Sequence, residues 1–188
     1  MQGKIFSTLI GRLTADEPQI QNARRASVSV ILSGRDAPKI MLIKRAEKTG
    51  DPWSGQAAFP GGKSQEIDRS ARDTAIRETC GEVGIDLNAT SKFLGYFRPF
   101  RTHIGAIVVI PSVFLLRRRV AVRINEEVSS YRWLNLRELL SAESAATCTV
   151  YHNGELKEVP ALRFGNYVIW GLTHRIICSL LPAETFSV

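Results

Sequence analysis

The clearest pattern of apolar and polar positions lies in the middle of the chain, over residues 69–83. Small or apolar side chains recur there at steps of three and four residues: Ala71, Ala75, Ile76, Thr79 and Val83. This is the period of a helix that packs one face on a core. Gly84 follows, as is typical of the residue with positive φ that ends a helix. The pattern therefore predicts a helix over 69–83.

The remaining apolar pattern predicts strands around this helix and further helices near both ends of the chain. Apolar residues at helical spacing predict helices over 3–13 and 167–181. Strands are expected over 26–32, 39–45, 93–98, 104–116, 129–134, 147–151 and 159–164. The segments 86–91 and 99–103 are interpreted as loops. This order predicts an α/β fold with a mixed sheet, arranged as an α/β/α sandwich in a single domain over 1–188.

Composition indicates an ordinary globular protein. The chain has 188 residues, of which 44% are hydrophobic and 23% are charged. It has no apolar run of about 20 residues, and it does not begin with a signal-peptide pattern. Its three cysteines are widely spaced and form no C-x-x-C pair. We therefore expect no membrane partner and a cytoplasmic location.

The net charge of +7 favours an anionic partner. The basic residues are scattered, except for Arg24-Arg25 and Arg117-Arg118-Arg119. The chain has no zinc-finger spacing, no RNP-type aromatic strand and no long basic arm, so a nucleic-acid partner is not expected. The arginine triplet is interpreted as a solvated strand end or turn, and the alternative is a patch that binds phosphate or nucleic acid.

Two acids on the predicted central helix suggest a metal site. Glu78 and Glu82 are four residues apart, so their carboxylates lie on the same helix face. Such a pair costs a surface helix about 0.2–0.5 kcal/mol, but hard oxygen ligands of this kind favour Mg²⁺ or Mn²⁺. Arg77 is placed to orient the carboxylates through paired hydrogen bonds. Upstream, the tight Gly61-Gly62 turn lets the backbone approach the metal closely.

The stretch from Phe59 to Ile85 resembles the Nudix box, G-x5-E-x7-R-E-U-x-E-E-x-G-U, in which U is bulky and apolar. Arg77-Glu78, Glu82 and Gly84-Ile85 match it, and Thr79 stands at the first U. The resemblance implies a Nudix-like α/β/α sandwich and a hydrolase that uses Mg²⁺ or Mn²⁺. It also implies that Glu78 and Glu82 hold the metal and that the glycine turn supplies a backbone ligand.

The chain departs from the box at two places. Gly81 occupies the position of the first Glu of the E-E pair, which removes a metal ligand. The early Glu position falls on Arg69, and the glycine pair comes too early, as if the loop had gained a residue, with Asp68 beside the vacated position. Either the remaining acids still hold at least one metal ion, or the protein binds nucleotides with reduced or no turnover.

The lengthened loop and the residues before it are similar to the coenzyme A diphosphatase branch of the family. Leu42 to Ala46, Gly55 and the F-P-G-G sequence resemble its signature, with three departures: one residue is inserted before Gly55, Ile43 replaces a threonine, and Gly50 or a neighbour replaces the middle arginine. The expected reaction converts coenzyme A to 3′,5′-ADP and phosphopantetheine, and ADP-ribose or dinucleotides are the alternative substrates. Arg45 is predicted either to hold a substrate phosphate or to be solvated. Many relatives are dimers, so a homodimer is expected.

A further acid could compensate for Gly81. The candidates are Glu66, Asp68, Glu126 and Glu127. Several Nudix enzymes carry a catalytic or metal-binding Glu well after the box, in a stretch similar to E-V-x-x-x-x-W, which favours Glu127. Asp68 has two equal interpretations, as the N-cap of the box helix and as a site residue.

Overall fold

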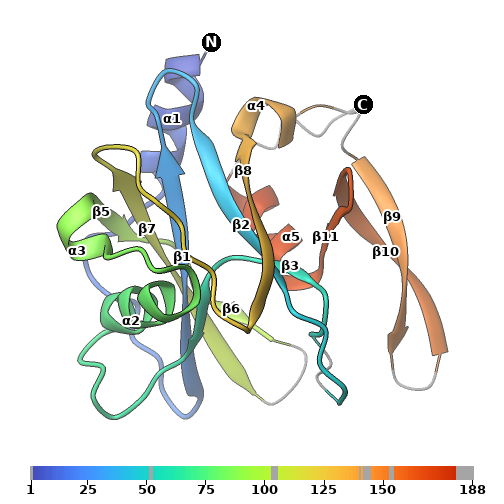
Figure 1. Ribbon diagram of the computed structural model, residues 1–188. Helices are drawn as coiled ribbons and strands as arrows, with labels where there is room; N and C mark the ends of the chain where they lie inside the picture. The colour runs from blue at the N-terminus through green and yellow to red at the C-terminus, as the bar shows by residue number, and fades with distance from the viewer. Residues whose placement is uncertain are drawn as a thin grey trace.

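The computed structural model describes residues 2–50, 53–102, 106–139, 141, 145–152 and 155–180. Within these residues, eight strands form one mixed sheet and three form a smaller antiparallel sheet (Figure 1). The helices are α1 (Gln2–Ile10), α2 (Ala71–Val83), α3 (Leu87–Thr90), α4 (Leu136–Leu139) and α5 (Gly171–Leu180). The large sheet contains β1 (Arg24–Ser33), β2 (Lys39–Arg45), β3 (Ala57–Ala58), β4 (Gly61–Lys63), β5 (Ser91–Tyr96), β6 (Phe100–Arg101), β7 (Ile107–Leu116) and β8 (Val128–Asn135). The smaller sheet contains β9 (Ala145–His152), β10 (Glu155–Phe164) and β11 (Tyr167–Trp170).

Strand β1 organises the large sheet. One of its edges pairs in parallel with β7, whereas the other edge is shared between two antiparallel partners. The first part of that edge, around Ser27, pairs with β4, and the last part, at Leu32 and Ser33, pairs with β2. Between them, the backbone N–H of Ser29 donates to the carbonyl of Pro60 at 2.7 Å. The shared edge therefore fixes the glycine turn beside the middle of β1.

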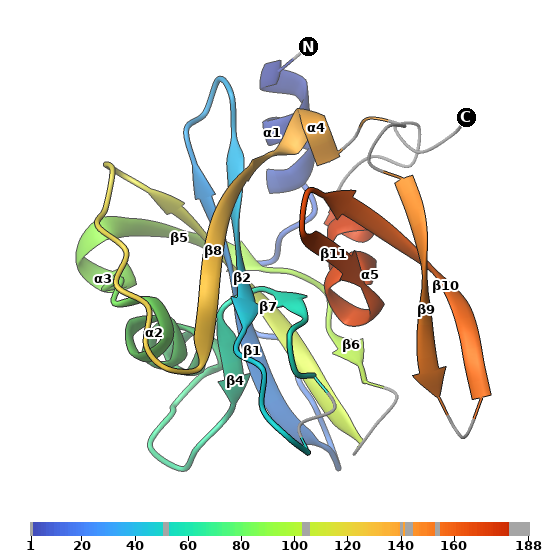
Figure 2. The same ribbon diagram turned by 45° about the vertical axis from the view of Figure 1, so that its right-hand side comes forward.

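The large sheet lies between two helical layers, as the α/β/α prediction requires. Successive residues of β1 face opposite sides, because side chains alternate along a strand. Val30 and Leu32 belong to the core that contains residues of α1 and α5. Ile31 belongs to the core that contains Ala75 and Val83 of α2. Figure 2 shows α2 on one side of the sheet and α1 and α5 on the other.

Helix α2 confirms the predicted central helix, although it begins two residues later than expected. Its buried face includes Ala71, Ala75, Thr79 and Val83, and Gly84 ends it with φ of 68°. The N-cap is Ser70, whose Oγ accepts a hydrogen bond from the N–H of Asp73 at 3.1 Å. The interpretation of Asp68 as the cap is therefore wrong, because its carboxylate is engaged by another part of the helix.

Strand β7 accommodates a proline in the interior of the sheet. Pro111 is buried and lies opposite Val28 of β1. Its carbonyl accepts a hydrogen bond from the N–H of Phe97, just after the end of β5. Because the N and C=O groups of one strand residue point to the same side, the missing N–H of Pro111 costs no hydrogen bond to β1. The strand passes through Pro111 without losing its parallel partner.

The structure corrects the sequence interpretation in several segments. The segment 86–91 contains α3, because the Asp86 side chain accepts from the N–H groups of Asn88 and Ala89 and so caps a helical turn. The predicted helix 167–181 is instead β11 followed by α5, and it is interrupted at Gly171, which has φ of 61°. The short strand β6 forms within 99–103, where a loop was expected, and the short strand β3 was not predicted. Residues 103–105 and 153–154 lie outside the described residues.

The α1 helix ends at Ile10, earlier than the predicted position 13. Among the described residues, none of the helices has both the length and the apolar character needed to span a membrane.

Candidate active site

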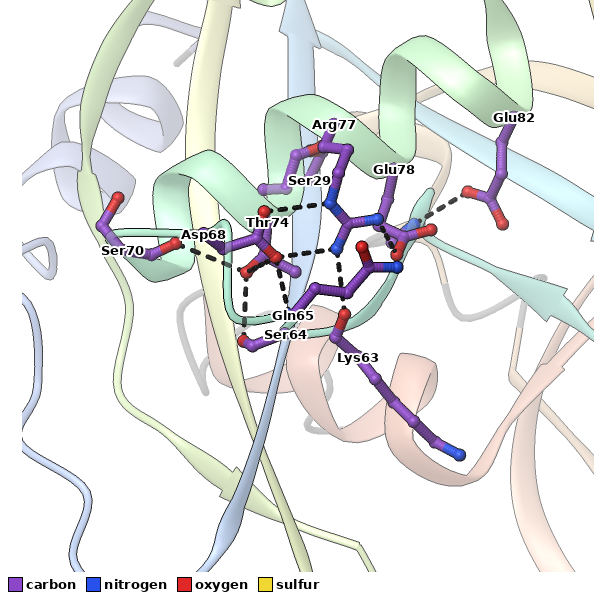
Figure 3. Close-up of polar contacts among 12 residues, drawn as sticks. Ser29, Lys63, Ser64, Gln65, Asp68, Ser70, Thr74, Arg77, Glu78 and Glu82 are labelled. Carbon is purple, nitrogen blue, oxygen red and sulfur yellow. Dashed lines mark hydrogen bonds and ion pairs between the residues drawn. The ribbon is translucent and has the colours of Figure 1, made fainter.

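The candidate site lies where the glycine turn meets the C-terminal half of α2 (Figure 3). The N–H of Gly61 donates to Oε2 of Glu82 at 2.9 Å. A Cβ atom on Gly61 would lie 2.4 Å from the carbonyl oxygen of Ser27, and one on Gly62 would lie 2.6–2.8 Å from the carboxylate of Glu78. Real Cβ atoms essentially never make contacts that short. Gly61 is therefore required by the backbone of β1, whereas a side chain at Gly62 would displace the carboxylate of Glu78. The turn therefore brings backbone directly against both acids of the predicted pair.

Glu82 is the most buried acid of the site, with 4% of the residue exposed. The pKa of its carboxyl group is raised to about 7; burial is the largest cause, and the negative charges of Glu78 and Glu127 contribute to the rise. The hydrogen bond from Gly61 and the positive charge of Arg45 act in the opposite direction. The structure thus brings the predicted site residues Arg45, Gly61, Glu78, Glu82 and Glu127 to one place.

Arg77 connects the helix to the preceding loop. Its Nε and Nη2 donate to the two carboxylate oxygens of Asp68 at 2.9 and 2.7 Å, and its Nη1 donates to Oε1 of Glu78 at 2.6 Å. Its Nη2 also donates to the carbonyl of Lys63. A guanidinium bound to two carboxylates at once fixes the direction of both. Arg77 therefore holds Glu78 through one hydrogen bond, whereas its paired hydrogen bonds, which were predicted to orient the carboxylates of the acidic pair, go to Asp68.

The sequence interpretation did not assign Asp68 to this contact. The side chain is 4% exposed and also accepts from the N–H of Gln65 and the hydroxyl of Thr74. The hydrogen bond from Arg77 is the largest cause that lowers its pKa, to about 2. The available sequence signal was an acid in the lengthened loop between the glycine turn and the box helix, but spacing alone did not indicate which helix residue it would reach.

The sequence analysis also did not predict two backbone hydrogen bonds at the C-terminal end of α2, next to the acids. The N–H of Arg123 donates to the carbonyl of Val83 at 2.9 Å, and the N–H of Asn125 donates to the carbonyl of Glu82 at 3.1 Å. The loop that precedes β8 is therefore bound to the end of α2, which places Glu127 near Glu82. Any residue except proline can supply such an N–H, so no pattern of side chains in the sequence predicts this contact. Glu66 and Glu126, the other candidates for an added acid, are exposed.

The donor set fits a hard divalent cation. Glu78 and Glu82 supply carboxylate oxygens on one helix face, and the negative charge concentrated around the buried Glu82 favours a cation there. The described residues contain no group of three or more His, Cys, Asp or Glu side chains placed to hold a metal. The chain therefore offers two carboxylates where the box motif carries more. Mg²⁺ commonly retains several water ligands, so such a site suffices for one ion.

Gly81 explains why the acidic cluster is small. It is exposed on α2, and, apart from its chain neighbours and the adjacent backbone of the helix, no heavy atom of the described residues lies within 4 Å of the position that its Cβ would occupy. A glycine in a helix interior costs about 1 kcal/mol relative to alanine. Unlike Gly61, Gly81 is not required by any close contact. A larger side chain can therefore be accommodated there.

Replacing Asp68 with asparagine is expected to lower the free energy of unfolding by about 1–2 kcal/mol at pH 7, because hydrogen bonds to a charged partner are lost. The depressed pKa of Asp68 stabilises the native state above the unfolded pKa of 3.8, and this contribution is lost as the pH falls toward about 2. The stability difference from the wild type should therefore shrink between pH 4 and pH 2.5. Urea unfolding at these pH values measures it.

The exposed Glu66→Gln variant, in the same loop, is the control for Asp68→Asn and should change stability by less than about 0.5 kcal/mol. A difference between Asp68→Asn and the wild type that stays constant down to pH 2.5 would contradict the assignment of the Asp68–Arg77 pair.

The fold and the site together define a class of protein: an α/β/α sandwich with paired carboxylates on one helix, held against a glycine turn. The NUDIX domain profile matches residues 23–150. An uncharacterized Nudix hydrolase NudL from Yersinia pestis (strain Pestoides F) is 32% identical over 187 residues, covering 93% of this chain and 92% of the relative. The chain therefore belongs to the Nudix domain family, and its relatives are hydrolases.

Solved structures confirm the fold. A MutT/nudix family protein from Enterococcus faecalis superimposes with a TM-score of 0.55 at 21% identity, covering 86% of this chain. The chain spans 62% of that protein. The NUDIX domain of Shewanella oneidensis NrtR, solved with ADP ribose, has a TM-score of 0.50 at 20% identity, covering 64% of this chain and 78% of that one. At these identities, the likeness concerns the fold alone.

Proposed function

We propose that this protein hydrolyses the diphosphate linkage of a nucleoside diphosphate joined to another moiety, with Mg²⁺ or Mn²⁺ at Glu78 and Glu82. The observation that carries the proposal is the buried carboxylate of Glu82, fixed by the N–H of Gly61 one helical turn from Glu78. We expect a small-molecule nucleotide substrate and a cytoplasmic location, and we expect the protein to form a homodimer.

The residues of the site have separate roles. The divalent cation, when bound, supplies neutralisation of the diphosphate charge and a more acidic water. Arg77 keeps Glu78 in position, and Gly61 keeps Glu82 in position. Arg45, whose positive charge acts on Glu82, is assigned to a substrate phosphate.

Glu127 is assigned as the general base, because it is exposed on the loop that is bound to the end of α2. Its carboxylate takes a proton from water as the water oxygen bonds to phosphorus. The anhydride P–O bond breaks, and two phosphate monoesters leave.

Coenzyme A is the proposed substrate, giving 3′,5′-ADP and phosphopantetheine. The proposal rests on the similarity of residues 42–62 to the coenzyme A diphosphatase signature and on the lengthened loop after the glycine turn. A second candidate, a nucleotide-binding protein with little turnover, is favoured by one observation: Gly81 leaves an empty position where the box motif carries an acid.

Incubation with coenzyme A, ADP-ribose and NADH at millimolar Mg²⁺ or Mn²⁺ tests the proposal. Chromatography is expected to show monoester products, with the highest kcat/KM for coenzyme A. Preference for ADP-ribose would transfer the assignment to that substrate. Binding of all three ligands without products would favour the second candidate.

A further inference from the structure

A basic groove lies at the end of the large sheet away from the glycine turn. It has a volume of about 900 Å³, and its lining includes Ser33 and Gly34 at the turn between β1 and β2. Ser33 is five residues beyond Val28, against which Gly61 packs, so at about 3.3 Å per strand residue the two points are about 16 Å apart. In both ribbon views, this turn is at the top of the sheet, whereas α2 lies lower, across one face of the sheet (Figures 1 and 2).

The walls of the groove are positively charged. They carry six cationic side chains from three segments of the chain: Arg35, Lys39, Lys92, Arg117, Arg118 and Arg119. The residues that line the groove include no acid. Within the part of the chain that the structure describes, the six cations form no ion pair with a carboxylate. Their charges therefore add to a concentrated positive potential inside a concave surface, which attracts anions.

The floor of the groove is apolar and belongs to the folded core. Leu115 and Leu116 are buried at the end of β7, and Trp133 of β8 packs against the same core as α2. This arrangement suits a phosphorylated organic molecule. The cationic side chains would bind its phosphates, and the apolar floor would contact its organic part. The volume lies in the range of small-ligand pockets, about 300–1,000 Å³.

We propose that this groove is a second anion-binding site, which takes a small molecule carrying two or more linked phosphates. The cations gather in one hollow instead of following a stripe along the surface, which favours a compact ligand over a strand of nucleic acid. The arginine triplet, interpreted from the sequence as a solvated strand end, is assigned by the groove to phosphate binding. This proposal goes beyond the proposed hydrolase function and does not depend on it.

Calorimetry with inorganic tripolyphosphate in EDTA and 150 mM salt tests the proposal. Without divalent metal, the carboxylates of the candidate active site repel an anion, so binding reports on the groove. We expect the wild type and the Glu82→Gln variant to bind with equal affinity. The triple variant Arg117→Gln, Arg118→Gln, Arg119→Gln is expected to bind at least tenfold more weakly. These arginines are exposed, so the fold should survive.

The matched control removes the same three charges elsewhere, by Arg137→Gln, Lys157→Gln and Arg163→Gln, all of which are exposed. It should weaken binding less than threefold. An equal loss in both triple variants would show that net charge alone attracts the anion and would overturn the proposal, as would no binding to the wild type. A single-stranded RNA of 12 nucleotides that binds the groove a hundredfold more tightly than tripolyphosphate would overturn it in favour of a nucleic-acid surface.

Discussion

Replacing Glu82 with glutamine is expected to lower kcat at least a hundredfold. The substitution keeps the size of the side chain and an oxygen that accepts from the N–H of Gly61. It removes the negative charge that the divalent cation requires, and the loss of one such electrostatic contact costs about 10²–10³ in rate. Steady-state kinetics with coenzyme A, together with titration of Mn²⁺ binding, measures the effect.

The fold of the Glu82→Gln variant should be retained, since a neutral amide is easier to bury than a carboxylate. The control is Glu126→Gln, an exposed acid on the neighbouring loop, which should keep kcat within twofold. If the Glu82→Gln variant binds Mn²⁺ and turns over substrate like the wild type, the metal site lies elsewhere.

Replacing Gly81 with glutamate is expected to raise kcat/KM at least tenfold. The new carboxylate would lie on the same helix face as Glu78 and Glu82 and would restore a metal ligand. The space around Gly81 is open, so the side chain enters without displacing a neighbour. Assays at limiting Mg²⁺ should show the largest gain, because the added ligand acts through metal affinity.

The Gly81→Glu variant also stabilises α2 by removing a helical glycine, which is worth up to about 1 kcal/mol. Gly81→Gln is the matched control, since it has a similar helix propensity without the charge. An equal rate in the glutamate variant and the wild type would show that another acid, with Glu127 the first to test, already completes the site.

The large sheet, the central helix and the acidic pair could be predicted from the sequence, because each has a local signal. Helical spacing marked the buried face of α2, and a four-residue step placed Glu78 and Glu82 together. The partner of Asp68 could not be predicted, since Arg77 reaches it across a loop whose path depends on the sheet. The basic groove was missed for the same reason: its cations come from segments that meet only when β1, β5 and β7 align.

The segment Tyr167–Trp170 shows a different reason why a sequence pattern can fail to predict secondary structure. Its apolar residues continue into those of α5 with helical spacing, so one long helix was expected. Pairing with β10 overrides this pattern, as Phe164 and Tyr167 form a register pair around a turn at Gly165. A four-residue window of apolar side chains fits a strand as well as a helix, and the deciding hydrogen bonds come from a distant strand.

The divided edge of β1 has a consequence for how this site tolerates change. Because β4 is paired to β1 and Gly61 is bonded to Glu82, the two parts of the site are fixed to each other by the sheet and the helix. The connecting residues 64–70 contribute the Asp68–Arg77 contact and the Ser70 cap, but their number does not set the distance between the glycine turn and Glu82. Insertions that leave Asp68 and Ser70 in contact with α2 are therefore expected to change the entrance to the site without moving the two acids.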